Sequence, residues 1–161
     1  MDRVSTDLSR YRILLCLLLQ CTWGILQTAL GAAVFLRYRT GKRFVYRSAL
    51  VIQYPLLSSL SLGPFLFITN RPPRDRSGKI PQSEVARRLL VHEYGHTIQS
   101  LLLGPLYLPA VGLPSALWNH LPCFRRKWRG GVSYFSFFTE RSANALGERF
   151  TGEPSMGSAL L

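Results

Sequence analysis

Hydrophobic positions concentrate first in residues 13–36, which contain no charged side chain over 24 positions. As one helix this segment would be about 36 Å long, enough to cross a bilayer core of about 30 Å, and it is too long for the apolar region of a signal peptide. We expect a transmembrane or interfacial helix over 13–36, preceded by an N-terminal tail over 1–12. Gln20, Gln27 and Thr28 are polar, which indicates either a partner element or an interfacial position.

The next two apolar segments have the composition of β-strands. Residues 44–54 and 59–68 are rich in β-branched and aromatic side chains, and a Gly-Pro pair marks a bulge or an edge position in the second. We expect both to be strands of a short antiparallel sheet. Residues 69–82 are polar and contain prolines, which predicts a loop.

Helical signals dominate the second half of the chain. A helix is predicted to begin near residues 81–83 and to end at residue 103, where a Gly-Pro pair stops it. A last helix is predicted over 139–150, followed by a flexible tail over 151–161. The predicted fold class is therefore mainly α with a small β element (α+β).

Two further segments give weaker signals. Residues 106–118 are apolar but are interrupted by two prolines and a glycine. Basic residues flank this segment on both sides, which favours a re-entrant or interface-lying segment over a clean membrane crossing. Residues 132–138 are predicted to form a short extended piece.

The composition favours a membrane location. The chain has 161 residues, the size of one domain, and is 47% hydrophobic and 17% charged with a formal net charge of +12. Low charge density with a basic excess is typical of a membrane protein with Lys/Arg-rich flanks. The basic residues border apolar segments instead of alternating with aromatic ones, which argues against nucleic acid as a partner. We expect the partner to be a lipid bilayer with anionic lipids.

The distribution of charge predicts an orientation. Five basic residues lie within 37–47, whereas residues 1–12 mix acidic and basic side chains. By the positive-inside rule, the portion after residue 36 is expected in the cytoplasm. A site in that portion would therefore lie on the cytoplasmic side of the membrane.

The segment LLVHEYGHTIQS, residues 89–100, contains the pattern His-Glu-x-x-His. On a helix, His92 and His96 lie one turn apart on one face, where both imidazoles can bind one zinc ion. Glu93 lies about 100° further round, so it is no ligand but can act as a general base on a zinc-activated water. Gly95 inside a helix predicts close packing of another backbone. The alternative is two histidines that satisfy backbone groups or face water.

A zinc ion that performs hydrolysis takes three protein ligands and a water. Glu140 is the best third candidate, because Thr139 is predicted to cap the last helix and to place Glu140 in its first turn. Asn144 lies one turn further along the same face and is expected to hydrogen-bond a ligand from the second shell of the site. The alternative role of Glu140 is to stabilise a helix start. Substitutes for it are Glu148 and Glu153 and, more weakly, His120.

His-Glu-Tyr-Gly-His followed by a Thr-Glu-x-x-Ala-Asn helix resembles the zincin metallopeptidases, in particular the branch with glutamate as third ligand. The resemblance covers under half of the chain. It implies His92, His96 and Glu140 as zinc ligands, Glu93 as the base, and a peptide or protein substrate. That branch usually has an acid one turn after the glutamate, where this chain has asparagine. Residues 37–150 are expected to form a membrane-associated zincin-like domain around these two helices.

Nearly the whole chain also resembles a group of short bacterial membrane proteins with no known activity. The segments that carry this resemblance are WGILQT, SLGPFLFI, HEYGHTIQSLLLGPLYL, GLPSALW and FTERSANALGE. The resemblance implies an intact unit in a bacterial cell membrane, and it implies no mechanism.

The function expected first is a small membrane-associated zinc hydrolase of the peptidase type. Zinc would activate water and stabilise the oxyanion, with Tyr94 or Tyr134 adding a hydrogen bond. Residues 59–68 would offer an edge strand to an extended peptide. One alternative is a non-enzymatic membrane protein with a structural metal or none. Another is a basic peripheral protein that binds anionic lipid through 37–47 and 125–129.

Overall fold

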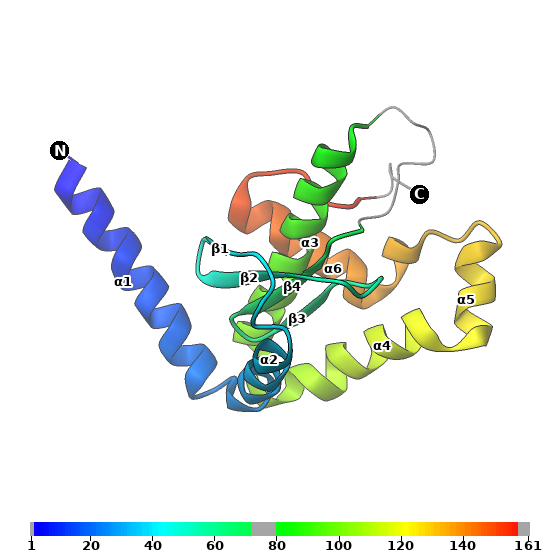
Figure 1. Ribbon diagram of the computed structural model, residues 1–161, viewed down its shortest axis with the longest axis horizontal. Helices are drawn as coiled ribbons and strands as arrows, with labels where there is room; N and C mark the ends of the chain where they lie inside the picture. The colour runs from blue at the N-terminus through cyan, green and yellow to red at the C-terminus, as the bar shows by residue number, and fades with distance from the viewer. Residues whose placement is uncertain (1, 72–79, 158–161) are drawn as a thin grey trace.

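The computed structural model describes residues 2–71 and 80–157, which form helices around one small sheet (Figure 1). The predicted α+β class, mainly α with a small β element, is confirmed for these residues. Residues 72–79 of the predicted loop and 158–161 of the predicted tail lie outside the described ranges. In chain order the elements are α1 (Asp2–Cys21), α2 (Ile25–Arg37), β1 (Arg43–Tyr46), β2 (Ala49–Tyr54), β3 (Leu60–Leu62), β4 (Phe65–Thr69), α3 (Gln82–Leu103), η1 (Gly104–Leu106), η2 (Leu108–Gly112), α4 (Leu113–His120), α5 (Pro122–Arg129), η3 (Tyr134–Ser136) and α6 (Phe138–Thr151).

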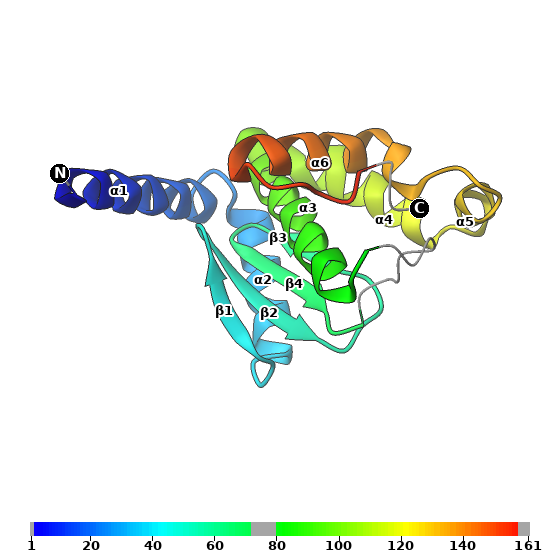
Figure 2. The ribbon, with the colours of Figure 1, turned by 90° about the horizontal axis from the view of Figure 1, so that it is seen from above.

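The first apolar segment forms two helices, so the prediction of one continuous helix over 13–36 is wrong. α1 and α2 meet at an angle of 94°, and α1 begins at Asp2, inside the predicted tail. In both ribbon views α1 projects away from the body of the protein (Figures 1 and 2). Among the described residues no single helix has the length and hydropathy to cross a bilayer, and only the bent pair Arg10–Cys21 and Ile25–Arg37 meets both criteria jointly.

Two glutamines account for the bend. Gln20 Nε2 donates to the Thr97 carbonyl at 3.2 Å, and Gln27 Nε2 donates to Ser100 Oγ at 2.9 Å and to the Gly104 carbonyl at 3.0 Å. A buried amide without hydrogen bonds costs about 1–3 kcal/mol, so these contacts hold the bend against the end of α3. Of the two positions considered for these side chains, contact with a partner element is the one observed.

Each predicted strand segment forms a β-hairpin. The β1–β2 turn contains Arg47 with φ of 53°, and the β3–β4 turn contains Gly63 with φ of 60°. The two hairpins lie side by side through their second strands, in the order β1-β2-β4-β3. β2 and β4 therefore pair in parallel, while the outer pairs are antiparallel. The predicted antiparallel sheet is wrong at this central pair.

Helices cover both faces of the sheet, with α3 on one side and α2 on the other (Figure 2). This follows from the alternation of side chains along each strand. The side chains toward α3 include Ala49, Val51, Leu66 and Ile68. Those toward α2 include Ile52, Tyr54 and Phe67. α2, part of the segment expected to lie in a membrane, thus also completes the core beneath the sheet.

α3 and α6 cross at very short distance. A Cβ at Gly95 would overlap the carbonyl oxygen of Ala143, and a Cβ at Gly147 would overlap that of Val91. The prediction that another backbone packs against Gly95 is confirmed. This crossing brings the middle of α3 next to the first turns of α6 (Figure 2).

Of the three remaining predicted segments, 132–138 and 151–161 differ from the structure. The segment 106–118, expected to be re-entrant or interface-lying, is helical: short turns over 104–112, π-helical over Leu108–Gly112, lead into α4. Residues 132–138 contain a 3-10 turn in place of an extended piece. The described part of the predicted tail is ordered against the core, because Met156 is 1% exposed and the Ser155 hydroxyl donates to the Glu148 carboxylate at 2.7 Å.

Candidate metal centre

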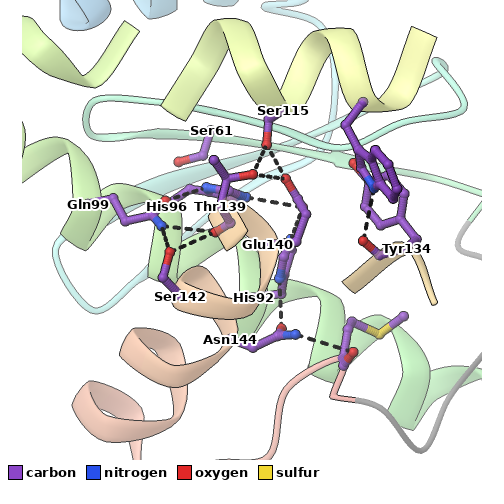
Figure 3. A network of polar contacts seen from close by, with 12 residues as sticks. Ser61, His92, His96, Gln99, Ser115, Tyr134, Thr139, Glu140, Ser142 and Asn144 are labelled. Atoms are coloured by element: carbon purple, nitrogen blue, oxygen red, sulfur yellow. Dashed lines mark hydrogen bonds and ion pairs between the residues drawn. The ribbon is translucent and has the colours of Figure 1, made fainter. Parts of the chain in front are cut away.

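The two helices bring His92, His96 and Glu140 together (Figure 3). The histidines lie one turn apart on α3, and Glu140 lies in the first turn of α6. Glu140 Oε2 is 3.2 Å from His92 Nε2 and 3.6 Å from His96 Nε2. The three ligand atoms lie within 4.8 Å of one another, and all three residues are buried. A group that could hold one metal ion is therefore present where it was predicted.

Hydrogen bonds behind the imidazoles fix their tautomers. His92 Nδ1 lies 2.8 Å from Asn144 Oδ1, and His96 Nδ1 lies 2.7 Å from Gln99 Oε1. Each amide NH2 group donates elsewhere, to the Met156 and Thr139 carbonyls respectively, so each amide oxygen faces its imidazole. Both Nδ1 atoms are then donors and both Nε2 atoms face Glu140, so in each neutral imidazole Nε2 would carry the lone pair that a metal ion takes.

This arrangement fits a divalent metal ion. Two neutral imidazoles and one carboxylate are a donor set suited to zinc and to related transition ions. Metal-binding histidines almost always donate their other ring N–H to an oxygen, as Asn144 and Gln99 allow here. The hydrogen bond expected between Asn144 and a ligand is thus present.

Glu140 uses its second oxygen for two hydroxyl groups. Oε1 accepts hydrogen bonds from Ser115 Oγ of α4 and from Thr139 Oγ1, the latter at 3.1 Å. Thr139 was predicted to be the N-cap of the last helix, but α6 begins at Phe138, with Phe137 at the cap position and no side-chain cap. The Thr139 hydroxyl is therefore available for the carboxylate.

The charges of the triad depend on one another. Burial disfavours the ionised form of Glu140, but the hydrogen bond from His92 and the charge of His96 hold its pKa well below the ordinary value. Burial by itself lowers the pKa of His96, but the hydrogen bond and charge of Glu140 outweigh it and raise that pKa to about 9. In the metal-free protein, a proton on His96 thus balances the buried carboxylate.

Glu93 is a buried carboxylate beside the triad. Within the described residues its side chain has no hydrogen-bond partner, and it lines the same cavity as the triad. Burial raises the pKa of Glu93, although the charges of His92 and His96 partly offset this. A carboxyl group without a fixed partner at a cavity can accept and release a proton, and its raised pKa makes it a stronger base than an ordinary glutamate.

A cavity of about 690 Å³ lies over these four residues. Its volume is in the range of sites that bind small molecules or peptide side chains. Much of its wall is apolar, including Leu56, Leu57, Leu60, Leu62, Leu108 and Val132. The triad and Glu93 thus form a polar patch in a largely apolar hollow.

The two candidate tyrosines lie in different places. Tyr134 lines the cavity, and burial together with the charges of Glu140 and Glu93 raises its pKa well above the ordinary value, so its hydroxyl keeps its proton. Tyr94 packs against the Tyr46 ring, and its hydroxyl lies 3.1 Å from Ser48 Oγ. The expectation that Tyr94 supports an oxyanion is not met, because its position on α3 faces the sheet.

The substitute ligands are engaged elsewhere. Glu148 accepts hydrogen bonds from Ser155, and Glu153 pairs with Arg87 at 2.9 Å. His120 lines the cavity but is exposed and does not belong to the triad.

Sequence reasoning missed two residues that complete the site. Gln99 follows His96 by three positions on α3, so helical spacing could have identified it. Ser115 is 25 positions from Glu140, and no local pattern connects an α4 serine to a glutamate on α6. Only the tertiary fold reveals that contact.

Three comparisons with known proteins give no match. The sequence matches no family model and no curated protein, and the fold matches no solved structure. No family is therefore assigned to the chain, and the likeness to zincins rests on the residues of the candidate metal centre alone.

Proposed function

We propose that this protein is a membrane-associated, zinc-dependent hydrolase that cleaves peptide bonds. The observation that carries the proposal is the unpaired, buried Glu93 carboxylate beside His92, His96 and Glu140 at one cavity. Structural zinc sites are almost always closed by four protein ligands, whereas this group has three, and Glu93 lies beside it without belonging to it. Burying such an acid costs stability, which a role in proton transfer would explain.

The chain's own residues then divide the work of hydrolysis. His92, His96 and Glu140 would hold the ion, and Asn144 and Gln99 keep both imidazoles oriented toward it. A bound divalent ion supplies polarisation of a water molecule and of the scissile carbonyl. Glu93 takes a proton from the attacking water and delivers it to the leaving amine. Tyr134, protonated and on the cavity wall, donates a hydrogen bond to the developing oxyanion.

The cavity walls favour an apolar peptide. β3 is an outer strand of the sheet and lines the cavity. The Tyr107 hydroxyl donates to the Ser61 carbonyl at 3.1 Å, and the Tyr54 hydroxyl donates to the Ser58 carbonyl. A peptide strand beside β3 would therefore use the other backbone groups of residues 58–62 and place its side chains against leucines.

Exposed leucines support the membrane part of the proposal. Soluble proteins rarely leave large contiguous apolar areas in contact with water. The exposed leucines that the structure describes on three helices are Leu14, Leu15, Leu18 and Leu19 of α1, Leu26, Leu30 and Leu36 of α2, and Leu113 and Leu117 of α4. Four of the eight residues of α5 are basic, which suits anionic lipid headgroups. We propose a bacterial cell membrane as the location, with the site on its cytoplasmic side.

Glu93→Gln is the decisive variant. We expect the zinc-loaded wild type to cleave a pool of fluorogenic apolar peptides in detergent micelles, and Glu93→Gln to lose at least about 100-fold in rate while keeping its metal. Glu84→Gln is the matched control, because Glu84 lies on the same helix and, among the described residues, pairs with the half-buried Arg88. Equal cleavage by the Glu93→Gln and Glu84→Gln proteins would refute the role of Glu93.

A structural metal is the second candidate. An ion in this centre would join α3 to α6, and the outer hydrogen bonds extend that link to Met156. In that case chelation would lower the melting temperature, no peptide would be cleaved, and Glu93→Gln would retain every measurable property of the wild type.

A further inference from the structure

We propose that Ser115 is a positioning residue that restricts Glu140 to one metal-binding oxygen. This inference rests on the proposed metal centre and not on the peptidase reaction. The two oxygens of Glu140 have separate partners: Oε2 faces both imidazoles, and Oε1 accepts the hydroxyls of Ser115 and Thr139.

Both hydroxyl groups lie within hydrogen-bond distance of the same oxygen, Glu140 Oε1. A hydroxyl has one proton to donate, and Ser115 Oγ and Thr139 Oγ1 lie 3.1 Å apart with Glu140 Oε1 beside them. If both donate to Oε1, that oxygen is held away from the imidazole nitrogens. Glu140 then presents Oε2 alone, and the centre offers three single-atom donors.

The number of donor atoms decides whether a coordination position remains for water. A four-coordinate ion with three protein donors keeps one position for water or substrate. Carboxylates can bind a metal through one oxygen or through both. A Glu140 free to rotate would offer its second oxygen and compete with water, which the hydroxyl pair prevents.

Ser115 is the member of the pair that comes from another element. It is the third residue of α4, and its hydroxyl contacts the Thr139 hydroxyl and the Glu140 carboxylate of α6. Ser115 also lines the cavity. α4, which forms one wall of the cavity, is thereby hydrogen-bonded to the metal ligand itself (Figure 3).

The test is the coordination of cobalt(II) in place of zinc. Four-coordinate cobalt(II) absorbs visible light more strongly than five-coordinate cobalt(II), so the spectrum reports the number of donors. We expect Ser115→Ala to keep the fold but to show weakened visible bands and about 10- to 100-fold lower zinc affinity. Ser115→Thr retains the hydroxyl and should retain the wild-type spectrum. Ser136→Ala, which removes an exposed hydroxyl bonded to Ser133, should also leave it unchanged.

The possible outcomes separate the inference from the function. A Ser115→Ala protein with the wild-type spectrum and zinc affinity overturns the role of Ser115, whatever the activity. A wild type that binds no metal overturns the metal centre and this inference with it. Altered cobalt bands in Ser115→Ala, combined with a wild type that cleaves no peptide, support the inference while the peptidase proposal fails. If Ser115→Ala does not fold, Thr139→Val, which removes the other hydroxyl on Oε1, decides by the same spectrum.

Discussion

At the scale of single residues, the metal content of the purified protein tests the triad directly. We expect about one equivalent of a divalent metal in the wild type and a large loss in both His96→Ala and Glu140→Gln, because each change removes one of three ligands. His120→Ala is the matched control, since His120 lines the cavity outside the triad. Elemental analysis after gel filtration measures the metal content of each protein. A metal-free wild type with an intact fold would refute the proposed metal centre.

The same residues predict a pH dependence of the metal-free protein. Because the pKa of His96 is raised to about 9 in the folded state, its stabilisation is fully present below its ordinary pKa near 6.5 and is lost as the pH rises through about 9. The lowered pKa of Glu140 acts on the other side, and its contribution is lost as the pH falls below about 4.5. In the presence of chelator, wild type should therefore exceed His96→Gln in melting temperature at pH 6, and the difference should shrink by pH 9.5. A constant difference would show that the two side chains are not paired.

The ligands were predictable from sequence because they follow a local rule. Residues four apart on a helix share one face, and this rule relates His92 to His96 and Glu140 to Asn144. That the histidine pair lies next to Glu140 and Asn144 was suggested by the resemblance to zincins and by the scarcity of other acids in the chain. Ser115 could not be identified from the sequence, because its contact with Glu140 depends on how α4 lies against α6.

At the scale of elements, the crossing of α3 and α6 gives a stability prediction. Gly95→Ala should destabilise the protein by about 1–3 kcal/mol, because the added Cβ would overlap the Ala143 carbonyl and the helices must separate. The higher helix propensity of alanine, about 1 kcal/mol, offsets only part of this. Gly112→Ala is the control, because a Cβ there would meet Leu108 at an ordinary 3.5 Å. Denaturant unfolding measures the stability of both variants. Equal unfolding midpoints for Gly95→Ala and Gly112→Ala would contradict the close crossing of α3 and α6.

The elements that sequence reasoning got wrong are those defined by distant contacts. The bend between α1 and α2 is held by Gln20 and Gln27 against residues more than 70 positions away, so composition alone suggested one helix. The β1–β2 turn contains Arg47 at positive φ, and arginine gives no turn signal. α3 was predicted closely, because its period, length and C-terminal Gly-Pro pair are local features.

At the scale of the whole molecule, α1 gives a prediction about membrane binding. It projects from the body and exposes Leu14 and Leu18, at 56% and 63%, one turn apart. Because burial of a leucine side chain contributes about 1.5–3 kcal/mol, we expect the double change Leu14→Ser and Leu18→Ser to reduce partition onto anionic vesicles more than tenfold. Val45→Ser is the control, since Val45 on β1 is 72% exposed outside the helices with the leucine surface.

Salt separates this apolar binding from attachment by charge alone. At high ionic strength the attraction of basic segments to anionic lipid is screened, whereas insertion of leucines is not. In vesicle flotation at high salt, a substantial fraction of the wild type should therefore stay bound to the vesicles. Most of the α1 double variant should be released under the same conditions. Complete release of the wild type by salt, with no difference between the α1 variant and Val45→Ser, would instead favour a basic peripheral protein held through residues 37–47 and 125–129.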